Sequence, residues 1–221
     1  EESQKHFRLP DDLRIELVAS EPLIADPSAM LVDHRGRMFV CELHGYNLEG
    51  HLDIVELNRS GKLDREVRRV RVEGDLLERA KEGRTGTVKR LIDRDGDGRM
   101  DDCEVWADDL PPCYGMVAFR DGLIVVCGPD IVFVADRDDD GRAEVRQLLF
   151  TGFDVEVMER AINNPRWGLD GWIYVAAGGG DPTAAGPALT EATHLGRTDF
   201  RFRPDGSRIE AVTGANGTFG H

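Results

Sequence analysis

Acidic residues in one short stretch, 93–104, have the spacing of a calcium-binding loop. Carboxylates stand at loop positions 1, 3, 5, 9 and 12, and glycine stands at position 6, where such a loop turns sharply. Ca²⁺ takes about six to eight oxygen ligands, and this spacing supplies most of them from one loop. We expect the ligands to be the main-chain carbonyl of Arg99 and the side chains of Asp93, Asp95, Asp97, Asp101 and Glu104.

The same pattern returns at Asp136, 43 residues after Asp93. We expect the ligands of this second loop to be Asp136, Asp138, Asp140, Arg142 through its carbonyl, and Glu144. Position 12 is now Gln147, so this loop has one charge fewer and should bind a cation more weakly. The alternative for both loops is a polar turn without metal, but carboxylates this close repel one another unless a cation neutralises them.

Strand-like runs, and not amphipathic helices, flank both loops. Residues 87–92 and 103–106 flank the first loop, and residues 131–134 and 145–150 flank the second. The loops are therefore predicted to be metal-clipped hairpin turns and not helix-loop-helix EF-hands. Without a helix after the loop, Glu104 is the least firmly held of the expected ligands.

Further strand-turn-strand units, most of them with an Asp-Gly turn, surround the two loops. They span residues 29–41, 116–127, 166–176 and 200–209. Hairpins with short turns therefore alternate with hairpins that carry acidic loops. Two hairpins make a four-stranded sheet, and sheets that repeat every ~40–50 residues are typical of the blades of a β-propeller. The sequence predicts an all-β fold of this kind.

The predicted propeller begins after a lead-in segment, residues 1–28, in which alternating apolar residues indicate a strand at 13–19. Residues 29–221 would form about three to four blades, the second over roughly 115–160. Three to four blades do not close a ring and leave sheet edges exposed. We therefore expect the chain to be the N-terminal part of a longer protein, truncated at its C-terminus.

Residues 47–86 fit this repeat less well and are predicted to be an insertion in the first blade. The insertion would contain a hairpin at 52–62 and a short charged helix at 75–82. An incomplete extra blade is the alternative.

Composition excludes several classes of partner. The formal charge of the 221 residues is −14, which argues against binding to nucleic acid or to an anionic membrane. No apolar run is long enough to cross a bilayer. The four cysteines, which allow three complete pairings, contain no CxxC motif and so indicate neither a zinc ribbon nor a thioredoxin site. Disulfides and buried free thiols both remain open.

One signature carries a family resemblance. Residues 163–174 read Asn-Asn-Pro-Arg-Trp-Gly-Leu-Asp-Gly-Trp-Ile-Tyr, and they accompany the paired acidic loops, the motif at 149–153 and the motif at 199–204. With these motifs the chain resembles the N-terminal propeller of a membrane-bound dehydrogenase family that is abundant in planctomycetes and verrucomicrobia. The resemblance implies a six-bladed propeller related to soluble quinoprotein glucose and sorbosone dehydrogenases.

The resemblance also implies an activity and a place. Such a protein would be exported to the periplasm or cell surface and would oxidise a sugar or polyol with pyrroloquinoline quinone (PQQ). A downstream or separate cytochrome c domain would accept the electrons. Candidate residues for binding or catalysis near the quinone are Arg160, Asn163, Arg166 and His221, and candidate cofactor contacts are Asn164 and Arg197.

The sequence departs from the quinoprotein pattern at one position. Arg160 stands where the relatives carry a general-base histidine, and arginine cannot act as a base at neutral pH. Glu156 or Glu159 would have to replace it. Two other functions therefore stay open: a non-catalytic calcium propeller that binds carbohydrate or a protein partner, and a lactonase-type hydrolase with a metal in its channel.

Overall fold

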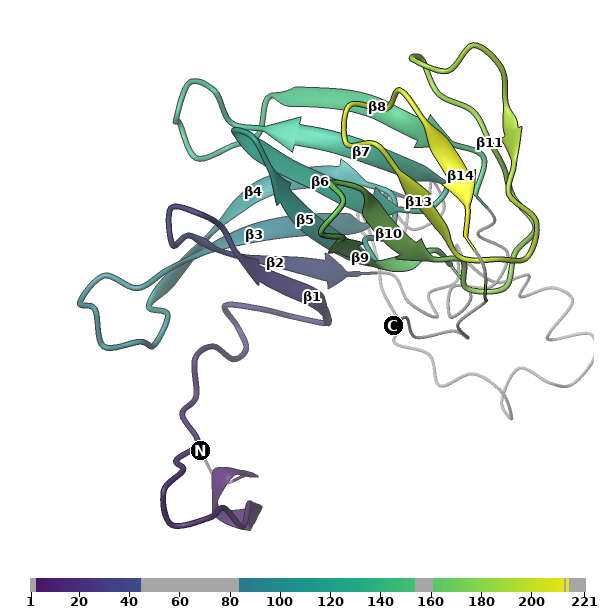
Figure 1. The fold of residues 1–221 in the computed structure, drawn as a ribbon. Helices are drawn as coiled ribbons and strands as arrows, with labels where there is room; N and C mark the ends of the chain where they lie inside the picture. The colour runs from purple at the N-terminus through teal and green to yellow at the C-terminus, as the bar shows by residue number, and fades with distance from the viewer. Residues whose placement is uncertain (1–2, 45–83, 154–160, 213, 215–221) are drawn as a thin grey trace, which may run out of the picture.

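The structure is a computed structural model, and it describes residues 3–44, 84–153, 161–212 and 214 (Figure 1). Apart from one short 3-10 turn, η1 (Ser3–His6), the regular elements of these residues are antiparallel β-strands. The predicted all-β class is confirmed. None of the described segments forms a helix with the length and apolarity needed to cross a bilayer.

Twelve of the strands build three four-stranded sheets in chain order. The first sheet contains β1 (Pro27–Val32), β2 (Met38–Leu43), β3 (Gly86–Ile92) and β4 (Asp102–Leu110). The second contains β5 (Gly115–Phe119), β6 (Gly122–Cys127), β7 (Asp130–Ala135) and β8 (Val145–Thr151). The third contains β9 (Asn163–Trp167), β10 (Ile173–Ala176), β13 (Phe200–Phe202) and β14 (Ile209–Ala211). The predicted pairing of successive hairpins into four-stranded sheets is confirmed.

Two interruptions leave this order intact. β2 pairs with β3 along its whole length, although residues 44–85 separate them in the chain. The hairpin and helix predicted within this separating segment lie outside the described residues. In the third sheet, the small pair β11 (Thr183–Ala184) and β12 (Thr193–His194) stands between β10 and β13 in the chain and forms a sheet of its own.

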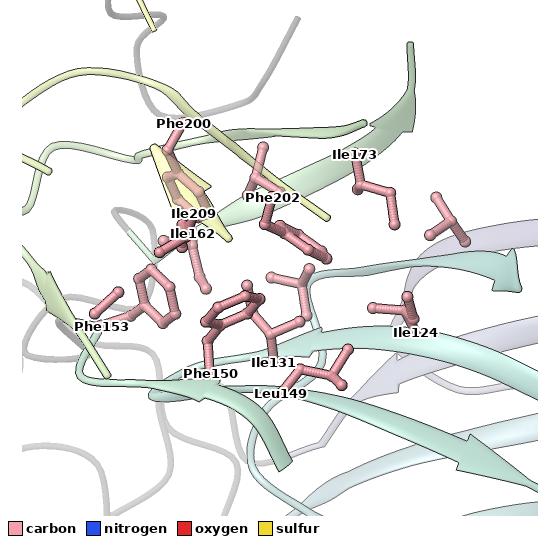
Figure 2. Close-up of a cluster of buried hydrophobic side chains, with 14 of the residues drawn as sticks. Ile124, Ile131, Leu149, Phe150, Phe153, Ile162, Ile173, Phe200, Phe202 and Ile209 are labelled. Atoms are coloured by element: carbon pink, nitrogen blue, oxygen red, sulfur yellow. The ribbon is translucent and has the colours of Figure 1, made fainter. Parts of the chain in front are cut away.

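The second sheet lies between the other two, and its strand β6 is buried along its whole length (Figure 1). Ile124 and Val126 pack into a core shared with the third sheet, whereas Leu123 and Val125 pack into a core shared with the first. Figure 2 shows the core toward the third sheet, where Phe150 packs edge-on against Phe202. A strand covered on both faces has no polar side, which explains the unbroken apolar run from 123 to 126.

The first strands of the three sheets are neighbours in space. β5 lies against β1 on one side and against β9 on the other. Each sheet therefore presents its first strand to the same region of the molecule. The described sheets are open and do not close on themselves.

The turns between the first and second strands of the three sheets take two forms. At 33–37 and 168–172 the two turns have the same backbone hydrogen bonds, with a left-handed glycine at Gly36 or Gly171. The turn between β5 and β6 differs from the predicted Asp-Gly type, because Phe119 pairs with Gly122 and leaves Arg120 and Asp121 as the turn. Arg120, with φ of 51°, takes the left-handed position. Gly122 is needed for space instead, because a Cβ there would lie 2.1 Å from the carbonyl oxygen of Val134.

The prediction of a strand at 13–19 is wrong. This segment is extended but pairs with no strand in the part of the chain that the structure describes. Its apolar side chains Leu13, Ile15 and Val18 are exposed, and the carbonyl of Val18 accepts a hydrogen bond of 2.8 Å from the amide of Met100. Alternation of apolar and polar residues is compatible with a strand, but a strand also needs a neighbouring strand to pair with. The sequence pattern does not show whether such a neighbour exists.

Candidate metal centres

The first acidic loop connects β3 to β4 and brings three carboxylates together. Oxygens of Asp93, Asp95 and Asp101 lie within 4.8 Å of one another. Backbone amides hold two of these side chains: Gly96 and Gly98 donate to Asp93 at 2.7 and 2.9 Å, and Arg94 donates to Asp101 at 2.8 Å. The hydrogen bonds from Gly98 and Gly96 lower the pKa of the Asp93 carboxyl, so it is ionised at neutral pH.

The second acidic loop connects β7 to β8 and repeats this arrangement. Oxygens of Asp136, Asp138 and Glu144 lie within 4.8 Å of one another. The amide of Gly141 donates to Asp136 Oδ2 at 3.1 Å, as Gly98 does to Asp93 in the first loop. The amide of Arg137 donates to the Glu144 carboxylate at 3.1 and 3.2 Å, which corresponds to the bond from Arg94 to Asp101.

In both loops the converging carboxylates come from positions 1, 3 and 9. Position 5 lies outside each group of three and has a local partner instead. Asp97 accepts a hydrogen bond of 2.7 Å from the amide of Arg99, and Asp140 accepts one of 2.8 Å from the amide of Arg142. These bonds shape the turn. The sequence analysis named all the converging carboxylates as ligands, and it also named Asp97 and Asp140, which lie outside the two groups.

Glu104, the expected twelfth-position ligand, points away from the first loop. Its Oε2 lies 2.6 Å from Nη2 of Arg90 on the neighbouring strand. The same oxygen faces the second loop, where a Cβ on Gly141 would lie 3.0 Å from it. Glu104 begins no helix and lies within β4, whose pleat directs its side chain toward the second sheet.

Three arginines of the loops pair with acidic residues outside the converging groups. Arg94 pairs with Asp102, and Arg137 pairs with Asp121 at 2.8 Å. Arg142 pairs with Asp108 of β4 at 3.0 Å. These three ion pairs join carboxylates other than the converging ones.

One carboxylate oxygen in the second group, Asp136 Oδ1, is buried without a hydrogen-bond partner among the described residues. A buried anionic oxygen without a partner is costly, and a bound cation would remove that cost. This signal is visible only in three dimensions, because the sequence does not report which oxygen of a carboxylate is covered.

The residues expected near a quinone are only partly described. Asn163, Asn164 and Arg166 lie on β9, the first strand of the third sheet. The Asn163 amide donates to the Ala161 carbonyl at 2.9 Å, and the Asn164 backbone amide lies 3.4 Å from the Tyr114 carbonyl. Arg197 is exposed in the segment between β12 and β13. The candidates Arg160, His221, Glu156 and Glu159 lie outside the described residues.

A buried polar cluster in the first sheet was missed by the sequence analysis. The carboxylate of Glu42 is fully buried, and its oxygens lie 2.6 Å from Nε2 of His44, 2.9 Å from Nζ of Lys89 and 3.0 Å from the Thr87 hydroxyl. The amide of Ala25 donates to it at 2.8 Å. All four partners stabilise the charged form, so this cluster is well satisfied and fastens the 20–26 segment to the sheet.

Residues 1–221 match a protein family described as a domain of unknown function, DUF7133. The chain belongs to the DUF7133 family. Comparison with curated proteins and with solved structures gave no match. The DUF7133 description names no activity, so the chemistry of this domain rests on its own geometry, and the resemblance to membrane-bound dehydrogenases stays a prediction.

Proposed function

We propose that this DUF7133 domain is a calcium-stabilised part of a β-propeller, in which each acidic hairpin loop binds one Ca²⁺. The observation that carries the proposal is the repetition: positions 1, 3 and 9 converge in two loops whose first residues are 43 residues apart. The loops also occupy the same place, between the third and fourth strands of successive sheets. Unrelated polar turns would not be expected to share ligand positions, amide contacts and location.

The donor set suits calcium. Three carboxylates offer hard anionic oxygens, and the outer members of both groups are exposed, so water can complete a coordination number of about six to eight. Mg²⁺ demands a more regular octahedron and sheds its own water reluctantly, which a three-carboxylate turn does little to overcome. The loops contain no cysteine or histidine among the converging residues, so zinc is a poorer fit.

The sheet arrangement supports a propeller. Three four-stranded antiparallel sheets follow one another in the chain, pack face to face, and bring their first strands side by side. Blades of a propeller have these properties, with first strands lining a central channel. In such a domain the acidic loops lie in the outer hairpins. A cation bound there would hold the outermost strand of a blade to the third strand of the same blade.

Lanthanide luminescence tests the proposal directly. Tb³⁺ replaces Ca²⁺ in oxygen sites and emits when a nearby indole is excited, and Trp106 is suitably placed. Its carbonyl accepts a 2.6 Å bond from Ala143 in the second loop, and it stands in β4 shortly after the first. We expect sensitised emission that Ca²⁺ reverses and that Asp95→Asn with Asp138→Asn abolishes.

A matched control is the exposed turn aspartate Asp205, which caps Ser207 between β13 and β14. Asp205→Asn should leave the emission unchanged. Emission that survives loss of both loop aspartates, or the absence of emission from the unmodified chain, would contradict calcium binding by the two loops.

An oxidoreductase function is the second proposal, and the position of β9 favours it. Asn163, Asn164 and Arg166 stand on a first strand beside β5, where a propeller's channel would be. Their amide and guanidinium groups could donate hydrogen bonds to quinone carboxylates. The chain would be mixed with Ca²⁺ and PQQ, and sugar-dependent reduction of a dye would be measured. PQQ binding weakened by Arg166→Ala supports this function; no binding to the unmodified chain rejects it.

A further inference from the structure

Three of the four cysteines meet where the first sheet packs on the second. Cys41 of β2, Cys113 of the segment before β5, and Cys127 of β6 are fully buried and belong to one core cluster. Cys103 is only partly buried and lies in β4. All four are free thiols in this structure.

One hydroxyl group joins the backbones of Cys41 and Cys113. Ser28 Oγ donates to the Cys113 carbonyl at 2.7 Å and lies 3.3 Å from the Cys41 carbonyl. The two carbonyl oxygens are therefore within 6.0 Å of each other. The Cys113 thiol donates to the Pro111 carbonyl at 3.4 Å, and both side chains lie in the same buried cluster. A disulfide needs Cα atoms about 4.4–6.8 Å apart, so it requires two backbones that approach closely, and the hydroxyl of Ser28 joins these two backbones.

The surroundings keep the Cys113 side chain in this position. Gly86 of β3 packs against it, and a Cβ on Gly86 would lie 2.8 Å from Cys113 Sγ and 2.1 Å from the Pro111 carbonyl. A larger residue at 86 would therefore push the thiol away. The absence of a side chain lets the segment before β5 lie directly on the first sheet, with the Cys113 thiol against Gly86.

We propose that Cys41 and Cys113 form a disulfide when the chain folds in an oxidising environment. The bond would join β2 of the first sheet to the entry of the second. In a glutathione buffer, a cysteine thiolate attacks oxidised glutathione, and the second cysteine then displaces the attached glutathione. The two protein thiols lose two electrons and two protons, one protein S–S bond forms, and one oxidised glutathione becomes two reduced molecules.

The bond should form before the two sheets close on each other. The contact with the Cys41 thiol raises the pKa of the Cys113 thiol well above its usual range, and burial raises it further. The thiolate, which is the reactive form, is therefore scarce in the folded protein. Once formed, the bond would be equally protected from reductants. This inference is independent of calcium binding and of any dehydrogenase activity.

Peptide mapping of the refolded full chain tests the proposal. The chain is refolded in glutathione buffer, free thiols are alkylated under denaturing conditions, and the protein is digested without reduction. A glutamate-specific protease is required beside trypsin, because cleavage after Glu104 separates Cys103 from Cys113. We expect one linked peptide pair containing Cys41 and Cys113, with two alkylated cysteines. Four alkylated cysteines in a chain that unfolds cooperatively, or a pair containing Cys127, would overturn the proposal.

Serine variants provide a second measurement. Cys41→Ser and Cys113→Ser should each leave three free thiols, whereas the control variants Cys103→Ser and Cys127→Ser should each leave one. Reduction should lower the Tm of the oxidised chain by about 10 °C, because the bond closes a long loop. It should not lower the Tm of Cys113→Ser. An equal effect of reductant on both proteins would contradict the assigned pair.

Discussion

The buried carboxylate of Glu42 makes a quantitative prediction for the variant Glu42→Gln, which keeps the shape of the side chain and removes its charge. Burial alone raises the pKa of Glu42, but the hydrogen bonds from His44, Lys89 and Ala25 outweigh burial and lower the pKa from 4.5 to about 2. The folded state therefore favours the ionised form. This preference stabilises the fold above pH 4.5 and is lost as the pH falls from 4.5 toward 2.

The magnitude follows from the linkage between protonation and folding. At about 1.36 kcal/mol for each tenfold change in the acid constant, the preference contributes about 3 kcal/mol at pH 7. The same relation leaves less than half of this at pH 3. Unmodified protein and Glu42→Gln should therefore differ by about 3 kcal/mol in free energy of unfolding at pH 7, and the difference should shrink by about half at pH 3.

Urea denaturation at pH 7, 5, 4 and 3, followed by tryptophan fluorescence, measures this difference. Other carboxylates titrate in both proteins and cancel in the comparison. Glu16→Gln is the matched control, because Glu16 is exposed and forms a surface ion pair with Arg14 at 2.8 Å; its effect should stay below about 0.5 kcal/mol. A gap between unmodified protein and Glu42→Gln that is the same at pH 7 and pH 3 would refute the reasoning.

Three further substitutions test the packing and the surface charges by urea denaturation. Gly122→Ala should lower the free energy of unfolding by more than ~3 kcal/mol, because the added Cβ would overlap the Val134 carbonyl. Gly36→Ala meets nothing within 4 Å and should lower it by only about 1–2 kcal/mol, because the backbone at Gly36 is left-handed. Equal losses for the two variants would contradict the close approach at Gly122. Phe150→Ala should lose about 3–5 kcal/mol because the side chain is fully buried between two sheets, and a loss below 1 kcal/mol would contradict that core. Asp108→Ala should lower the free energy of unfolding by less than about 1 kcal/mol despite the two ion pairs of Asp108, because both pairs are exposed to solvent. A loss above ~2 kcal/mol would contradict this exposure.

The fold was predictable wherever a strand and its partner are neighbours in the chain. Apolar runs on either side of a turn identified the hairpins, and their alternation gave the four-stranded sheets. The pairing of β2 with β3 was harder, because residues 44–85 intervene, and only the register of the whole repeat indicated it. The prediction at 13–19 failed because the alternation resembles that of a strand, whereas no strand among the described residues pairs with this segment.

The candidate metal centres were predictable as loops and less so as ligand sets. Spacing located both acidic turns, but the borrowed loop template assumes an exiting helix, which would bring position 12 back to the metal. Here a strand follows, and Glu104 turns to Arg90 instead. Position 9 then supplies the third carboxylate in both loops. The Glu42 cluster left no sequence signal, since its partners come from three separate segments.

The complete burial of β6 has a consequence for how the domain tolerates change. In the described part of the chain, the buried clusters join the first sheet to the second and the second to the third, so a defect in the third sheet reaches the first through the second. Stability in such a series behaves as a sum of unit and nearest-neighbour terms. Substitutions at the two ends should therefore add independently, whereas those in β6 weaken both interfaces at once. Duplication of a sheet together with its acidic loop would likewise lengthen the series without redesign of the existing cores.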